Sequence, residues 1–404
     1  MENVSSSNGL EKRPKLRFPG FDEPWKENEL SHYLVENTER NRGLAFGKED
    51  VLSVSGEYGV INQIAFQGRS FAGESVADYH VVETDDIVYT KSPLKANPYG
   101  IIKVNKGIPG IVSTLYAVYH PLNTVAPRFV DLYFANDLRL NKFLKPLVNI
   151  GAKHDMKVNN SFVLTGTVVF PSIGEQQKLV DFFAKLDRRI EAQRKIVDTL
   201  KKYKRGLLNK VFSNINGNIY PTVYLSEVAD FLQGLTYSPS DVSVAGYLVL
   251  RSSNIQNGVL SFDDCVYVDK KVDESLQVKC NDVIMCVRNG SKKLVGKTAL
   301  IPNNMAMTTW GAFMMIIRSK LNDTYIFHYL NSQMFFSQVF KDTGTATINQ
   351  ITKGILNECK LPLPPETARK QISKMLSSFD VKIQNAEMCL TTLVELKKAF
   401  LQQL

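Results

Sequence analysis

The chain contains one passage of sequence twice. Residues 168–190 read "VVFPSIGEQQKLVDFFAKLDRRI" and residues 360–383 read "KLPLPPETARKQISKMLSSFDVKI", in each case a Pro-containing extended approach to a charged amphipathic stretch. Pro171 falls on Pro364 at an offset of 193 residues (364 minus 171), and the helical passage that follows needs no gap. A duplication of this kind favours two similar structural units over a single fold.

The duplication extends upstream of this passage. "DDIVYTK" from Asp85 resembles "NDVIMCVR" from Asn281, and Gly100 falls on Gly296 at the same spacing. Two copies of a unit of roughly 190 residues therefore account for nearly the whole chain, a period far above the ~20 to 50 residues of solenoid repeats. At 404 residues the chain is also too long for one ordinary hydrophobic core.

Each copy has a β-rich part that includes some helix, followed by one long helix. We therefore expect an α+β protein with an internal pseudo-twofold repeat, in which two similar mixed α/β domains are separated by two long antiparallel coiled-coil helices. The predicted parts are a mobile tail at 1–16, a first domain at 17–167, a central helix at 168–216, a second domain at 217–360 and a C-terminal helix at 361–404.

The two long helices carry matching apolar seams. Apolar residues recur in alternating steps of four and three, which is typical of a coiled-coil stripe. One such helix alone would favour packing on its own domain, but two matched copies of about 40 residues favour pairing of the helices. Antiparallel pairing would place the domains at opposite ends of a rod, with its midpoint near Gln193 and Ala386. The seam residues that we single out are Leu179, Phe183, Leu186 and Ile190 in the first helix and Ile372, Leu376, Phe379 and Ile383 in the second.

Charge and cysteine content describe the environment of the chain. A net charge of +9 is compatible with a polyanionic partner and, equally, with a merely basic surface. The five cysteines form no CxxC pair, and their odd number argues against a disulfide framework, so a reducing, cytoplasmic environment is expected. The N-terminal stretch lacks the apolar region of a secretory signal, and no apolar run approaches ~20 residues, so a soluble protein is expected.

No stretch of the sequence matches a catalytic or metal-binding pattern. "GSKKLVGKT" at 290–298 has five residues between its glycines where a phosphate loop needs four, so a turn beside a strand is the better interpretation. The acidic pair in "DDCVYVDKK" is too common a pattern to indicate a nuclease. The five histidines show no ligand spacing, and no adenine methyltransferase motif of the Asp-Pro-Pro-Tyr or Asn-Pro-Pro-Tyr type is present. We predict neither a catalytic residue nor a metal or cofactor site in this chain.

A two-headed, quasi-symmetric basic protein is suited to a quasi-symmetric linear polyanion, and duplex DNA is the obvious one. Base edges are read by forked or amide side chains, whereas phosphates accept any cation. Loops after predicted strands supply both kinds, although such residues are also ordinary on surface loops. The candidate DNA-binding residues are Lys91, Lys95 and Asn97 in the first domain and Arg251, Asn254, Gln256, Arg288, Asn289, Lys292 and Lys293 in the second. The Gly-led stretches "GAKHDMK" from Gly151 and "GTATINQ" from Gly344 are further candidates.

The opening "RFPGFDEPWKENEL", the passage "FPSIGEQQKLVDFFAKLDRRI" and its second copy resemble the specificity subunit of Type I restriction-modification systems, over the chain from about Arg17. The resemblance implies two target-recognition domains that each read half of a bipartite DNA site, and spacer helices that dock two methyltransferase subunits. It implies that restriction subunits join the complex, and that the partners use S-adenosylmethionine, ATP and Mg²⁺. Glu175 and Gln176 match the docking pattern, but Ala368 and Arg369 replace them in the second copy.

Two functions from other classes remain open at this stage. A single-chain DNA-modifying enzyme would methylate DNA without partners. A purely structural coiled-coil scaffold would not bind a split DNA site.

Overall fold

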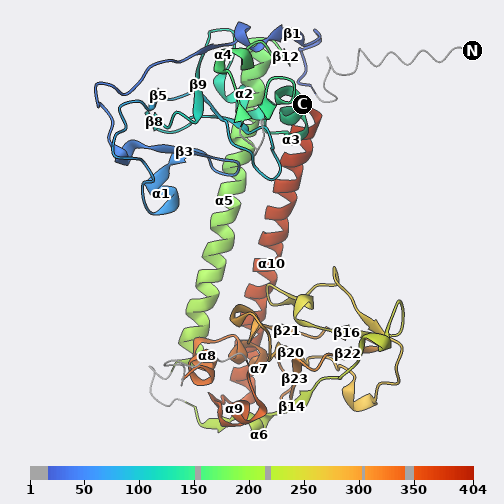
Figure 1. The fold of residues 1–404 in the computed structure, drawn as a ribbon. Helices are drawn as coiled ribbons and strands as arrows, with labels where there is room; N and C mark the ends of the chain where they lie inside the picture. Colours follow the sequence, from blue (N-terminus) through green and yellow to red (C-terminus); the bar gives the residue numbers. More distant parts are fainter. Residues whose placement is uncertain (1–16, 151–155, 214–219, 303–304, 342–349) are drawn as a thin grey trace, which may run out of the picture. The chain divides into compact units, whose positions relative to one another are not determined.

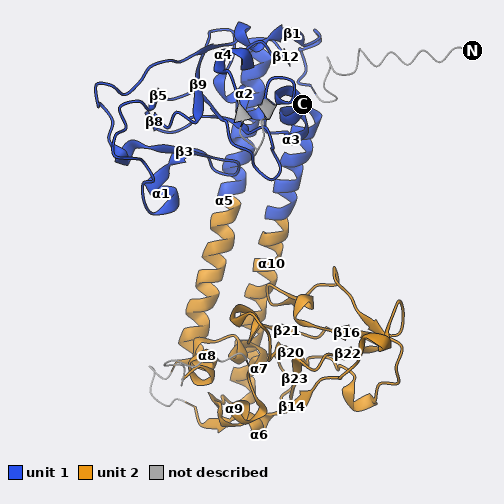
Figure 2. Ribbon diagram, viewed as in Figure 1, with its two compact units in different colours: residues 1–192, 390–404 blue, residues 193–389 orange. Residues whose placement is uncertain are grey.

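The computed structural model describes residues 17–150, 156–213, 220–302, 305–341 and 350–404 (Figure 1). The predicted tail at 1–16 lies outside them, as do most of the two Gly-led stretches from Gly151 and Gly344. The described chain forms two compact units, residues 1–192 with 390–404 and residues 193–389 (Figure 2). Each unit therefore contains part of both long helices.

Unit 1 is built on a four-stranded antiparallel sheet of strand order β2-β9-β6-β7. These strands are β2 (Leu34–Glu36), β9 (Tyr116–Pro121), β6 (Ile87–Thr90) and β7 (Ile101–Val104). The smaller pairings are β1 (Lys26–Glu29) with β12 (Thr167–Phe170), β3 (Leu52–Ser55) with β4 (Gly59–Asn62), β5 (His80–Val82) with β8 (Gly110–Val112), and β10 (Asn149–Ile150) with β11 (Met156–Lys157). Its short helices are α1 (Gln63–Gln67), α2 (Pro127–Tyr133), α3 (Asp137–Leu144) and α4 (Asn160–Val163).

Unit 2 repeats this plan with a four-stranded antiparallel sheet of order β14-β23-β20-β21. These strands are β14 (Ala229–Gln233), β23 (Met314–Ser319), β20 (Val283–Cys286) and β21 (Thr298–Leu300). A second sheet has the order β15-β19-β16-β22, from β15 (Val242–Ser243), β19 (Tyr267–Val268), β16 (Tyr247–Leu250) and β22 (Thr308–Trp310). The remaining elements are β13 (Thr222–Tyr224), β17 (Ile255–Gln256), β18 (Val259–Leu260), β24 (Lys360–Pro362), α6 (Leu225–Val228), α7 (Tyr325–Leu330), α8 (Gln333–Val339) and α9 (Lys353–Glu358).

Backbone geometry confirms the repeat inferred from sequence. Asp85 and its counterpart Asn281 both adopt positive φ, at 70° and 64°. Gly100 and Gly296 also share positive φ, at 89° and 87°. At Gly100 an added Cβ would lie 1.9 Å from the carbonyl oxygen of Thr90, so only glycine fits this turn.

A buried aspartate holds the same turn in both units. The Asp86 carboxylate accepts a hydrogen bond from the Glu83 amide at 2.8 Å, and the Asp282 carboxylate accepts one from the Lys279 amide at 2.7 Å. Burial raises the pKa of Asp86, which lies 2.5 Å from a ring nitrogen of His120. In unit 2 the partner of Asp282 is an arginine in place of the histidine. The Arg318 guanidinium donates to both carboxylate oxygens of Asp282, at 2.8 and 2.7 Å. The two sheets therefore share one internal anchor with different partners.

The two long helices are α5 (Ile173–Phe212) and α10 (Glu366–Gln403). Sequence placed their starts at 168 and 361, about five residues too early. The extended residues at those positions instead form strands β12 and β24, which pair with β1 and β13 near the N-terminal end of each copy. Within the described residues, no helix is long and apolar enough to cross a membrane.

Antiparallel pairing of the helices is confirmed inside each unit. In unit 1, Asp187 accepts a hydrogen bond from Lys397 at 2.5 Å. In unit 2, the Gln193 amide donates to the carbonyl oxygen of Ala386 at 2.9 Å, and Lys204 forms an ion pair with Asp380. The repeat offset maps Asp187 onto Asp380 and Lys204 onto Lys397. The two ion pairs are therefore the same interaction with the contributing helices exchanged.

Candidate nucleic-acid interface

The topology of unit 2 brings several polar loops to one edge. Strand β16 runs parallel to β22, so Leu250 and Trp310 lie side by side where both strands end. Strand β20 runs antiparallel to β23, which places Cys286 at the end of β20 opposite Met314 at the start of β23. The loops at 251–254, 287–293 and 311–313 consequently leave the two sheets at the same edge.

Direct contacts join these loops. The Asn289 side-chain amide donates a hydrogen bond to the hydroxyl of Ser252 at 3.1 Å. The Arg288 guanidinium lies over the ring of Phe313, 5.4 Å from its centroid, and the side chains of both residues are exposed. Sequence placed Arg251 and Arg288 on separate candidate loops, and the structure unites those loops in one surface.

The polar side chains of this surface differ in the contacts that they make. The Arg251 guanidinium forms an ion pair with Asp264 at 2.8 Å. Lys292 and Lys293 are exposed within a short turn of 3₁₀ helix. Gln256 is exposed and donates to the carbonyl oxygen of Ser253 at 3.0 Å. The stretch 290–298 is a turn that leads into β21, as the sequence indicated.

Asn254 has an internal role that makes it unsuitable as a base-reading residue. Its side chain is fully buried, and its amide nitrogen donates to the carbonyl oxygens of Ser261 and Asp264, both at 3.0 Å. The side-chain oxygen of Asn254 accepts a hydrogen bond from the backbone N–H of Arg251 at 2.9 Å. Because these bonds fix the loop that carries Arg251, we replace the predicted DNA contact of Asn254 with a loop-shaping role.

The first-domain candidates lie around the end of β6 in unit 1. The Lys91 ammonium donates to the side-chain oxygen of Asn160 at 3.2 Å, and partial burial is the main cause of its lowered pKa. Lys95 is exposed. Asn97 is buried and donates to the Asp137 carboxylate at 2.9 Å, which ties its loop to the start of α3. We therefore withdraw Asn97, like Asn254, from the base-reading candidates.

The residues predicted at the first helix entry fasten α5 to its own unit. Arg17 binds both carboxylate oxygens of the buried Glu175, at 2.9 and 2.7 Å. The buried Gln176 accepts the backbone N–H of Ala126 at 2.9 Å and donates to the carbonyl oxygen of Pro171 at 3.0 Å. These side chains are therefore directed into the unit and present no surface for subunit docking.

At the second helix entry, where Ala368 and Arg369 replace Glu175 and Gln176, other contacts within unit 2 hold the start of the helix. Arg369, which stands where Gln176 stands in the first copy, is buried and donates to the Asp323 carboxylate at 2.6 Å. It also lies 3.4 Å from the carbonyl oxygen of Pro364, the counterpart of Pro171. A different side chain thus secures the same helix start.

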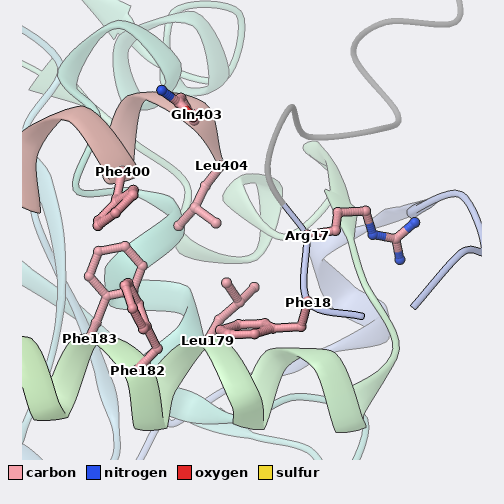
Figure 3. Close-up of a pocket in the computed structure, with 8 residues that line it drawn as sticks. All are labelled: Arg17, Phe18, Leu179, Phe182, Phe183, Phe400, Gln403 and Leu404. Atoms are coloured by element: carbon pink, nitrogen blue, oxygen red, sulfur yellow. The ribbon is translucent and has the colours of Figure 1, made fainter. Parts of the chain in front are cut away.

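The seam residues are largely enclosed by the packing of the helices. Leu179 and Phe183 are buried and line a cavity of about 210 Å³ in unit 1 (Figure 3). Phe400 of α10 lies across this cavity from Phe182 of α5, with 5.3 Å between ring centroids. The other seam residues are buried (Ile190 and Leu376) or half-buried (Leu186, Ile372, Phe379 and Ile383). They hold the helices within the units, so a docking partner would have to use other faces.

Sequence reasoning missed Phe313 at this edge, whereas Gln350 is the last residue of the candidate stretch "GTATINQ". The backbone of Gln350 pairs with that of Arg288, and Gln350 itself is exposed. Nothing in the sequence around Phe313 distinguishes an exposed phenylalanine from a core residue, because the pattern "GAFMMII" is typical of a buried strand. Across the described ranges no group of histidine, cysteine and acidic side chains could hold a metal ion.

Polar loops with exposed cations gather at one edge of unit 2, and the plan of its main sheet recurs in unit 1. Residues 220–392, less than half of the chain, match the family described as "Type I restriction modification DNA specificity domain". The resemblance seen in the sequence to Type I specificity subunits is thereby confirmed.

Sequence relatives extend this match. The specificity subunit of the Type I restriction enzyme StySPI of Salmonella potsdam is 26% identical over 194 residues, which cover 45% of this chain and 41% of the relative. The specificity subunit of MjaVIII from Methanocaldococcus jannaschii is 22% identical over 301 residues, 69% of each chain. The match to StySPI thus spans less than half of that relative's length.

A solved structure, that of the Type I restriction-modification S subunit from M. genitalium, has a similar fold. It superposes with a TM-score of 0.58 at 13% identity and covers 96% of this chain and 98% of that one. At this identity the likeness concerns the fold alone, and it agrees with the α+β architecture expected from the sequence.

Proposed function

We propose that this chain is the DNA-sequence specificity subunit of a Type I restriction-modification complex, in which each unit reads one half of a bipartite site. The observation that carries the proposal is the edge of unit 2, where Arg288 and Asn289 are held on joined loops beside exposed lysines. A forked guanidinium such as that of Arg288 discriminates base edges, and lysines bind phosphates. Asn289 fastens the two loops, because its side-chain amide donates to Ser252 and accepts the backbone N–H of Ser291.

The chain acts without chemistry of its own in this proposal. Two methyltransferase subunits dock on the outer faces of α5 and α10, and restriction subunits complete the nuclease. S-adenosylmethionine, ATP and Mg²⁺ are used by those partners in the cytoplasm. The segment aligned with the StySPI relative is less than half of that protein, so the methyltransferase and restriction partners are part of this proposal.

The test is co-purification of the full chain with the methyltransferase subunit of the same host, followed by methylation of genomic DNA and sequencing of the modified adenines. We expect one copy of the chain with two methyltransferase copies, and modification at a single split sequence. Methyl transfer by the chain without a partner, or DNA modification that ignores sequence, would overturn the proposal.

A further inference from the structure

The same tight turn leads into an inner strand of the main four-stranded sheet in both units. In unit 1 the Tyr116 amide donates to the carbonyl oxygen of Ser113 at 3.1 Å. In unit 2 the Met314 amide donates to the carbonyl oxygen of Gly311 at 2.8 Å. Strands β9 and β23, which these turns precede, occupy the same place in the two sheets.

Each turn exposes one large apolar side chain at its tip. Leu115 is 65% exposed in unit 1, and Phe313, at the equivalent position, is 60% exposed in unit 2. A single exposed apolar residue is ordinary in proteins. Its recurrence at the same turn, in two copies whose loop sequences have otherwise diverged, indicates a shared function.

The tips are held in place by backbone hydrogen bonds to the end of the neighbouring strand. The carbonyl oxygen of Leu115 accepts the backbone N–H of Lys91 at 3.2 Å, and that of Phe313 accepts the backbone N–H groups of Val287 and Arg288 at 3.0 and 3.2 Å. The apolar side chain is therefore fixed by the end of the neighbouring strand, where a lysine or an arginine follows. In unit 2 the guanidinium also lies over the Phe313 ring.

An exposed apolar tip has a specific complement in duplex DNA, because the 5-methyl group of thymine is the apolar feature of the major groove. In unit 2 the phosphates around that groove would also attract the Arg288 guanidinium beside Phe313. An exposed protein-docking patch would instead be expected to spread over several apolar neighbours. Each turn presents one large apolar side chain, which fits a base edge better than a protein surface.

We propose that Leu115 and Phe313 are specificity-determining residues, each of which contacts the 5-methyl group of one thymine in the half-site read by its own unit. This inference rests on the proposed function, because it presupposes that each unit reads DNA. It adds a named residue and a chemical group to each half of the recognition.

The test uses the assembled complex of full chain and methyltransferase subunits, and duplexes in which each thymine of the site is replaced in turn by deoxyuridine. We expect one position in each half-site at which loss of the methyl group weakens binding roughly fourfold, the effect of about one buried methylene. Phe313→Ala should weaken binding to the unmodified duplex by a similar factor and abolish the deoxyuridine effect in its half-site only. Leu115→Ala should do the same in the other half-site.

Matched controls remove exposed apolar side chains elsewhere. Val244, 97% exposed in unit 2, and Leu138, 83% exposed in unit 1, serve for this purpose. Val244→Ala and Leu138→Ala should leave binding to every duplex unchanged. Thermal unfolding of all four variants should match that of the parent, because each removes a side chain that makes few internal contacts.

Several results would overturn the inference. One is a parent complex that binds its site but tolerates deoxyuridine at every thymine. Another is a Phe313→Ala complex that loses affinity equally for all sequences, which would mark the ring as a backbone contact or a wedge. Loss of the methyltransferase subunit from that variant would mark the tip as a protein contact. A parent complex that binds no DNA would instead refute the proposed function itself.

Discussion

Arg369 and Gln176 occupy one position of the repeat, and each fastens the start of a long helix with different chemistry. Gln176 satisfies a backbone N–H and a carbonyl oxygen of its own unit. Arg369 instead brings a charge into the unit, and Asp323, only 4% exposed at its side chain, neutralises it. At the scale of single residues, equivalent positions of the two copies keep the same structural role but use different side chains.

This arrangement predicts the effect of removing the arginine. Arg369→Ala should lower the free energy of unfolding by about 3 kcal/mol, because it leaves the Asp323 carboxylate buried without its charged partner. The double variant Arg369→Ala, Asp323→Ala should be destabilised by clearly less than the sum of the single changes. Urea unfolding of the full chain measures all three.

The neighbouring Lys370 provides the control for this cycle. Lys370 forms an exposed pair with Glu366 one helical turn away, so Lys370→Ala should leave the free energy of unfolding almost unchanged. Equal losses for Arg369→Ala and Lys370→Ala would show that the Asp323 pair contributes nothing.

Recognition can also be tested at single residues. Arg288→Ala should cost about 1 to 3 kcal/mol for one half-site and relax its sequence preference, if the guanidinium forks onto a guanine. Arg251→Ala should have the same effect, although Asp264 must first release the side chain. The half-site read by unit 1 should be unaffected. A uniform loss of affinity for all sequences would identify these arginines as phosphate contacts, and the readout assignment would be wrong.

At the scale of secondary structure, the helices α5 and α10 are paired through interactions that exchange under the repeat. The ion pair of Lys204 with Asp380 in unit 2 corresponds to that of Asp187 with Lys397 in unit 1. Lysines at seam positions, which would be unfavourable in a uniform apolar stripe, therefore define the register in which the helices meet.

Charge exchange tests this register. Lys204→Asp should destabilise unit 2 by about 1 kcal/mol, since it places two carboxylates together at a half-buried site. The second substitution Asp380→Lys should restore most of that loss, because it recreates the pair in reverse. Lys202→Asp, at an exposed position nearby, is the control and should have little effect. If the double variant is no more stable than the single one, the pair does not set the register.

At the scale of the whole molecule, the proposed function predicts that the paired helices set the distance between the two half-sites. Seven residues inserted at Gln193 and seven at Ala386 would preserve the seam and lengthen each helix by roughly 10.5 Å. That length corresponds to about three base pairs. We expect the preferred spacer to lengthen and activity to fall, because the added DNA also turns by about 100° while the seam does not.

The measurement is methylation of a library of sites that differ only in spacer length. The control is the seven-residue insertion at Gln193 alone. It shifts one helix against the other and should disrupt the helix pairing. An unchanged spacer preference in a folded double-insertion complex would show that the helices do not set the distance.

The sequence by itself determined the duplicated plan of this protein. The duplicated passage, the shared glycines and the two seams predicted α+β units and antiparallel helices, because repeat offset and helical periodicity are properties of the chain alone. The same local signals indicated an extended approach at these residues but could not show that 168–170 and 360–362 pair as strands, since their partners lie far away in the sequence.

Only the tertiary structure decided which polar residues face inward and which loops meet. Asn97, Asn254 and Glu175 look like surface residues in sequence, yet all three are buried. Asn97 and Glu175 bond side chains from distant segments, and Asn254 bonds the backbone of its own loop region. Phe313 looks like core, yet a tight turn exposes it. Burial depends on what packs against a residue from the rest of the fold, and no local pattern contains that information.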